Sequence, residues 1–123
     1  MTPSTPRPLG ELRTLVVGVD DMDAACAFSE QTLGLRLKFR DGGRWAAFDA
    51  GGFTIALAGA DQKPMDSQVA LNIKVTDVAA ALQRAAAGGA TVVRAATAGP
   101  HETSGAFRDP AGLLVYVYSP LAP

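Results

Sequence analysis

The sequence contains a single cysteine, Cys26, so the chain cannot form an internal disulfide. It also lacks any apolar run close to the roughly 20 residues that a membrane-spanning helix requires. The N-terminal segment, with Pro3, Pro6 and Pro8, has no apolar stretch of the kind found in a signal peptide. These absences predict a cytoplasmic protein that does not enter a membrane.

An excess of positive charge is also missing. Lysine and arginine number 11 against 12 aspartates and glutamates, which gives a formal net charge of −1. No basic stripe is available to neutralise phosphates, so nucleic acid is not an expected partner.

An internal repeat is the most informative feature that is present. The segment Val19-Asp20-Asp21-Met22 aligns with Val75-Thr76-Asp77-Val78, and each follows a β-rich run, at residues 12–19 and 69–75. Asp21 and Asp77 stand at the expected N-cap positions of two helices, because their carboxylates can accept from free N–H groups of the first turn.

Helical periodicity follows both aspartates. The first helix is expected to run to about residue 32, and the second from residue 78 to residue 87, before Gly88-Gly89. The predicted core stripe of the first helix is Met22, Ala25, Phe28 and Thr32 or Leu33, and that of the second is Val78, Ala81, Leu82 and Ala85.

Three strand-like segments come after each predicted helix. They are residues 35–39, 44–48 and 53–57 in the first half, and 91–95, 106–108 and 113–118 in the second. Each half therefore reads β-α-β-β-β. The predicted fold class is α+β, with two βαβββ repeats forming a curved mixed sheet around a cavity and helices outside. We expect a flexible arm at 1–10 and one domain at 11–120, with repeat one at about 11–60 and repeat two at about 67–120.

The ordered set of motifs resembles the vicinal-oxygen-chelate superfamily of glyoxalases, bleomycin-resistance proteins, fosfomycin-resistance enzymes and extradiol dioxygenases. The resemblance covers about residues 12–119, and Ser29 departs from it where many relatives have tyrosine. The residues that carry it are the two aligned segments, Phe28, Leu33-Gly34-Leu35, Gly88-Gly89-Ala90 and Phe107-Arg108-Asp109-Pro110-Ala111-Gly112.

Metal-dependent members of this superfamily place ligands in the first and last strands of each repeat. The resemblance puts those ligand positions at Thr14, Ala56, Ala70 and Tyr116. Alanine cannot bind a metal, and threonine and neutral tyrosine are poor ligands beside histidine or a carboxylate. We therefore expect a metal-free member with no cofactor.

Period-two alternation assigns the strand faces and so predicts which residues line the cavity. The predicted ligand-binding residues are Thr14, Trp45, Ala56, Ala70, Asn72, Lys74, Leu114, Tyr116, Tyr118 and, from a loop at the mouth, His101. This wall is mostly apolar and aromatic, as is usual for small-molecule sites. Three of these residues have alternative roles: Trp45 could cap a sheet edge or fill a dimer interface, Lys74 could reach the rim of the cavity, and Asn72 could bond to a neighbouring strand.

The only histidine, His101, lies in the polar segment at residues 99–105, which is expected to be a loop. His101, Glu102 and Tyr116 are the candidates for any acid or base role, although an exposed loop histidine is the simpler interpretation. Cys26 is expected to be inert core.

These observations favour a metal-free protein that binds a partly aromatic metabolite or antibiotic. The alternatives are an enzyme of the same superfamily, either a lyase or isomerase or a metal-free acid/base catalyst, and an interaction module with a vestigial cavity. A homodimer is expected, because one repeat pair buries little surface and relatives commonly form two-fold dimers.

Overall fold

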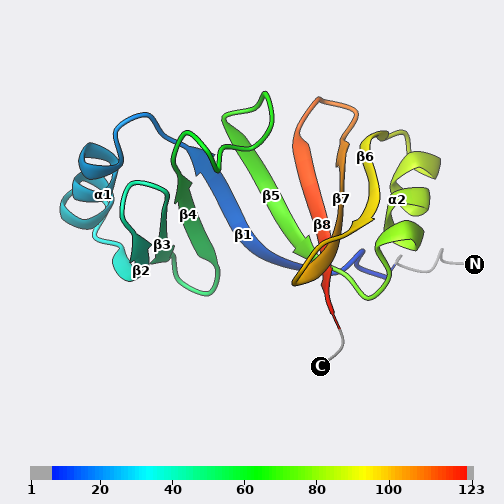
Figure 1. The fold of residues 1–123 in the computed structure, drawn as a ribbon, viewed down its shortest axis with the longest axis horizontal. Helices are drawn as coiled ribbons and strands as arrows, with labels where there is room; N and C mark the ends of the chain where they lie inside the picture. The colour runs from blue at the N-terminus through cyan, green and yellow to red at the C-terminus, as the bar shows by residue number, and fades with distance from the viewer. Residues whose placement is uncertain (1–6, 122–123) are drawn as a thin grey trace, which may run out of the picture.

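A computed structural model describes residues 7–121 and contains one curved eight-stranded sheet with two helices (Figure 1). The α+β class and the βαβββ order of each half are confirmed. The first repeat consists of β1 (Glu11–Gly18), α1 (Met22–Gln31), β2 (Arg36–Asp41), β3 (Trp45–Asp49) and β4 (Thr54–Ala58). The second consists of β5 (Val69–Lys74), α2 (Val78–Ala87), β6 (Thr91–Ala98), β7 (Glu102–Arg108) and β8 (Leu114–Pro120).

Each repeat supplies four neighbouring strands of the sheet, whose order is β2-β3-β4-β1-β5-β8-β7-β6. The first strand of each repeat pairs in parallel with the last, β1 with β4 and β5 with β8. The two repeats are joined by the antiparallel pair of β1 and β5. The repeats therefore pair with each other within one chain.

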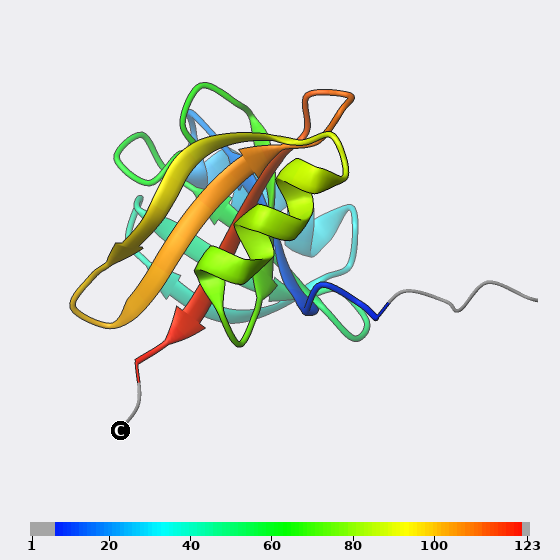
Figure 2. The ribbon, with the colours of Figure 1, turned by 90° about the vertical axis from the view of Figure 1, so that its right-hand side faces the viewer.

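Both helices begin at the predicted caps. The Asp21 carboxylate accepts from the N–H of Ala24, and the Asp77 carboxylate accepts from the N–H of Ala80, each at 3.0 Å. These bonds satisfy donors that the first turn of a helix otherwise leaves free. The helices lie at opposite ends of the sheet (Figure 1), and α2 crosses the outer face of β6, β7 and β8 (Figure 2).

The predicted stripe of α2 is confirmed, but that of α1 is partly wrong. Phe28 and Leu33 are each 55% exposed, whereas Met22, Cys26 and Ser29 are buried. Both sets satisfy the helical period, so the sequence pattern alone could not separate them. The buried face of α1 presents the short side chains of Cys26 and Ser29 to the sheet. Met22 and Cys26 pack there with Ala46, Phe48 and Leu57.

Helix α2 packs very closely on β7 at Gly105. A Cβ atom at Gly105 would lie only 2.8 Å from Cδ1 of Leu82 and 3.2 Å from Cγ1 of Val78. The absence of a side chain there allows the helix to lie against the sheet.

Two other expectations change. The segment expected to be a loop at 99–105 is shorter, because residues 102–105 already belong to β7 and pair with β8. Residues 1–6 of the predicted arm lie outside the described range, while Leu9 packs on the α2 core and Arg84 donates to the carbonyl of Arg7. Among residues 7–121, no helix is long and apolar enough to cross a membrane.

Candidate functional site

A row of polar side chains crosses the inner face of the sheet, opposite the helices. In the strand registers, Thr14 of β1 stands beside Asn72 of β5, and Asn72 stands beside Tyr116 of β8. On the other side, Thr14 pairs with Thr54 of β4, which pairs with Asp49 of β3. Period-two alternation had placed Thr14, Asn72 and Tyr116 on one face, and the register makes them successive neighbours.

A cleft of about 470 Å³ lies on this inner face, and we call it the main cleft. Its wall combines side chains from both repeats with residues 61–64 of the linker between β4 and β5. Four predicted ligand-binding residues meet there, together with Val16: Trp45, Asn72, Tyr116 and Tyr118.

Three other predicted residues do not reach the main cleft surface. Ala56, Ala70 and Leu114 are completely buried, and Ala70 and Leu114 pack together with Ala106 beneath Tyr116. Their strand registers put them on the inner face, but none of them is exposed. They support the cleft from below and offer no surface for a ligand.

The polar atoms of Asn72 and Tyr116 differ in their partners. The Tyr116 hydroxyl accepts from the backbone N–H of Met65 at 3.2 Å, which leaves its own proton free to donate. The Oδ1 atom of Asn72 is buried and has no hydrogen-bond partner among residues 7–121. A buried acceptor without a partner is uncommon in folded proteins.

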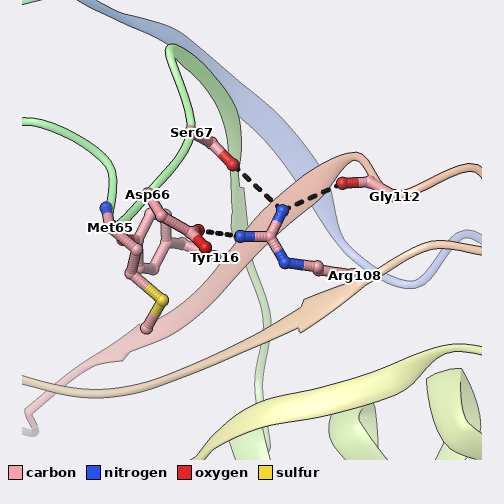
Figure 3. A network of polar contacts seen from close by, with 6 residues as sticks. All are labelled: Met65, Asp66, Ser67, Arg108, Gly112 and Tyr116. Carbon is pink, nitrogen blue, oxygen red and sulfur yellow. Dashed lines mark hydrogen bonds and ion pairs between the residues drawn. The ribbon is translucent and has the colours of Figure 1, made fainter.

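Arg108 bonds to the linker beside Tyr116 (Figure 3). Its guanidinium donates to the Ser67 hydroxyl and to the carbonyl of Gly112, both at 3.0 Å, and it forms an ion pair with Asp66. Figure 3 shows these contacts beside Met65, whose N–H donates to Tyr116, so the linker is joined to both β7 and β8.

The wall of the main cleft carries more charge than the sequence predicted. Asp61 and Lys63 of the linker line it, and they form ion pairs with Arg44 and Asp20 respectively. Arg94 of β6 and Glu102 of β7 also line it. The linker residues gave no periodic signal, and β6 has register shifts on both sides of Arg94, so alternation could not assign its face.

A second recess of about 590 Å³, which we call the side pocket, adjoins the main cleft. Tyr118 lies in the walls of both. Burial raises the pKa of Tyr118 above its ordinary value of about 10, Arg13 opposes this shift, and Glu102 adds to it. The hydroxyl therefore stays protonated at neutral pH and can donate a hydrogen bond. The side pocket wall includes Arg13, Thr14, Arg36, Lys38, Asp49 and Thr54.

The structure separates two predicted residues from the main cleft. Lys74 is exposed and lines a different recess, beside residues 8–11. His101 lies in the turn between β6 and β7 and lines a recess next to the main cleft; Glu102 belongs to both recesses. His101 is exposed, in agreement with the simpler interpretation of this residue.

The residues at the superfamily's metal-ligand positions do not fit a metal ion. Ala56 and Ala70 have no donor atom, Thr14 lies in the side pocket, and Tyr116 uses its oxygen to accept from Met65. Within residues 7–121, no three His, Cys, Asp or Glu side chains are grouped as metal ligands would be. The nitrogen, sulfur and carboxylate donors of these side chains are common protein ligands of divalent metals.

Comparison with known proteins agrees with the architecture. Residues 11–117 match the profile of the glyoxalase/bleomycin resistance protein/dioxygenase superfamily. An uncharacterized protein of Mycolicibacterium smegmatis is 36% identical over 111 residues, which cover 90% of this chain and 95% of that protein.

Two solved structures show the same fold at low identity. A member of this superfamily from Vibrio splendidus 12B01 is 19% identical with a TM-score of 0.66, over 88% of this chain and 98% of the other. The methylmalonyl-CoA epimerase of Mycobacterium tuberculosis is 20% identical with a TM-score of 0.59, over 91% and 89% of the two chains.

Proposed function

The chain belongs to the glyoxalase/bleomycin resistance protein/dioxygenase superfamily, and we propose that it is a metal-free member that binds a partly aromatic metabolite or antibiotic. The observation that carries this proposal is the convergence of Trp45, Tyr116 and Tyr118 on one cleft from strands of both repeats. Aromatic rings with a few placed polar groups are the common composition of small-molecule sites.

The size and the polar groups of the main cleft support a ligand-binding role rather than an interaction module with a vestigial cavity. Its volume of about 470 Å³ falls within the range of about 300–1,000 Å³ typical of ligand pockets. Within it, the free proton of Tyr116 can donate to a carbonyl of the ligand, and the Asn72 amide can bond to a neighbouring polar atom.

The absence of a resident metal is part of the proposal and rests on donor chemistry. Two of the four ligand positions are buried alanines, and the hydroxyl of the third, Tyr116, is already engaged. Elemental analysis of protein purified without chelators and then dialysed is expected to find no stoichiometric divalent metal. A metal retained at one equivalent per chain would overturn this part and favour an enzyme.

Trp45 allows a direct binding test, because it is the only tryptophan in the chain. Titration with the neutral aromatic amide 2-naphthamide is expected to change Trp45 fluorescence in a saturable manner. A Trp45 variant cannot be tested in this way, because replacing Trp45 removes the fluorescence signal. Calorimetry on Tyr116→Ala therefore provides the second measurement, and this variant is expected to bind 2-naphthamide more weakly than the wild type. Absence of saturable binding by both methods would contradict an aromatic binding site.

An enzyme remains the alternative, and one observation favours it. Glu102 lies in the main cleft wall and also borders the recess of His101, so an acid/base pair could serve a ligand at that edge. Once a substrate is known, loss of turnover in Glu102→Gln and His101→Ala would support catalysis. Unchanged turnover in both would remove these residues from consideration.

We also propose a homodimer in the cytoplasm. The two edge strands, β2 and β6, are exposed along their whole lengths, and an unpaired edge can pair with a strand of another chain. Sedimentation at micromolar concentration is expected to show a dimer, and a monomer would contradict it.

The free, buried thiol of Cys26 suits a reducing compartment such as the cytoplasm, which cell fractionation would test.

A further inference from the structure

The side pocket is a local region of positive charge in a chain whose formal net charge is −1. Its charged wall residues are three cations and one anion: Arg13, Arg36, Lys38 and Asp49. This excess is not an accident of one flexible side chain, because the cations come from two strands, β1 and β2, that lie three positions apart in the sheet.

The three cations differ in how they are neutralised. Arg36 pairs with Asp49 at 2.9 Å, and Arg13 pairs with Glu11 at 3.4 Å. Lys38 donates to the hydroxyl of Thr54 at 2.8 Å and has no carboxylate within 4.0 Å among residues 7–121. The pocket is therefore left with one uncompensated positive charge.

Lys38 is also placed to donate further hydrogen bonds. An ammonium has three N–H donors, and one of them is used by Thr54. Thr54 and Thr14 are paired in the register of β1 and β4, and both line the side pocket. Lys38, Thr14 and Thr54 together offer an ammonium and two hydroxyl groups to one acceptor, which is a donor set suited to a carboxylate.

The side pocket and the main cleft share one wall residue. Tyr118 belongs to both walls, and the polar row runs without interruption from Thr54 through Thr14 to Asn72. A single extended ligand could therefore have its ring between the aromatic side chains and its charged end beside Lys38.

We propose that the side pocket binds the carboxylate of the ligand, so that the natural ligand is an aromatic or arylalkyl carboxylic acid. A carboxylate is favoured over a phosphate group because only one wall cation lacks a carboxylate partner. This inference rests on the proposed function, because the ring of the same ligand occupies the main cleft.

Paired probes separate the two proposals. We would compare 2-naphthoate with 2-naphthamide, and 4-phenylbutyrate with its amide, by calorimetry and Trp45 fluorescence. The carboxylates are expected to bind about fivefold or more tightly than the amides at low salt, with the preference falling as ionic strength rises. Equal affinities of acid and amide would overturn the inference and leave the proposed function standing.

Three variants locate the effect. Lys38→Gln is expected to remove most of the preference for the carboxylate, because it weakens carboxylate binding more than amide binding. Lys74→Gln is the matched control, since it changes the net charge equally but lies in a different recess. Asp49→Asn keeps an oxygen for the N–H of Gly51, removes the one wall anion, and is expected to tighten carboxylate binding.

The remaining outcomes are also decisive. An equal loss of affinity in Lys38→Gln and Lys74→Gln would mean a general charge effect and would overturn the assignment of the side pocket. If neither acids nor amides bind, both this inference and the proposed function fail. Tighter binding of inorganic phosphate than of the carboxylates, lost in Lys38→Gln, would overturn the choice of a carboxylate.

Discussion

Asn72 and Tyr116 are direct neighbours in the parallel register of β5 and β8, yet only one of them has its polar side-chain acceptor satisfied. The Tyr116 oxygen accepts from Met65, while Oδ1 of Asn72 has no partner among residues 7–121. Both residues line the main cleft, Asn72 on the strand that joins the two repeats and Tyr116 on the next strand of the second repeat. An unpaired acceptor at this position costs folding free energy and is consistent with a role in binding.

The first prediction separates these two effects at Asn72. Asn72→Leu removes the unpaired acceptor with little change in volume, so the free energy of unfolding is expected to rise by about 1 kcal/mol. The same variant is expected to bind 2-naphthamide more weakly, because the cleft loses an amide. Urea unfolding and calorimetry measure the two. A clearly less stable variant would show that the Asn72 side chain is satisfied in solution.

A second prediction concerns Arg108 and the linker. Arg108→Ala is expected to lower the free energy of unfolding by about 1–3 kcal/mol, because its charged hydrogen bonds join β7 to the linker and to the turn before β8. Hydrogen exchange in residues 61–68 should become faster.

Arg44→Ala is the matched control for Arg108. Arg44 also pairs with the linker, through Asp61, but its side chain is 60% exposed against 26% for Arg108. A pair so exposed contributes about 0–1 kcal/mol. If both variants lose equal stability, the Arg108 network has no special role in holding the linker.

The third prediction tests the close contact between α2 and β7. In Gly105→Ala the new methyl group meets Leu82 and the backbone of Arg94, and overpacking of this kind costs about 1–3 kcal/mol. Gly43→Ala serves as control, because nothing lies within 4 Å of a Cβ at Gly43. Thermal unfolding compares the two, and equal melting temperatures would show that α2 can move away without cost.

Cys26 carries the fourth prediction, which concerns pH. Burial raises the pKa of the Cys26 thiol above its ordinary value of 9.0, with Arg40 opposing and Glu30 and Asp23 adding to the shift. The unfolded chain therefore releases this proton at a lower pH than the folded one, so the contribution of the thiol to stability falls as pH rises above about 9.

Two measurements check this behaviour. The stability advantage of the wild type over Cys26→Ala, measured by urea unfolding, is expected to be constant from pH 6 to 8 and to shrink from pH 9 to 10. At pH 8 the folded protein should react slowly with a thiol reagent and the urea-unfolded protein rapidly. Rapid reaction of the folded protein would show that α1 leaves the thiol accessible.

Much of the fold could be predicted from local sequence signals. Asp21 and Asp77 marked both helix starts, and the repeat they belong to indicated the βαβββ order of each half. Alternation within single strands placed Asn72 and Tyr116 on the inner face. These features depend on residues close together in the chain, so periodicity and capping chemistry carry them.

The site was less predictable, for identifiable reasons. The side pocket depends on Lys38, at the register shift in β2, and on Arg13, at the shift in β1, where alternation fails. Lys74 was predicted to be in the cavity because alternation assigns the face of a strand but not how far along the strand the cavity extends; Lys74 is the last residue of β5 and lines another recess.

The sequence by itself determined the helices, their caps and the repeat, because each depends on residue type and short-range spacing. The tertiary structure decided which face of α1 is buried, how far the inner-face side chains stand from one another, and that residues 61–64 form a wall of the cleft. Those properties depend on strand register, bulges and contacts between distant segments, which packing against the whole sheet selects.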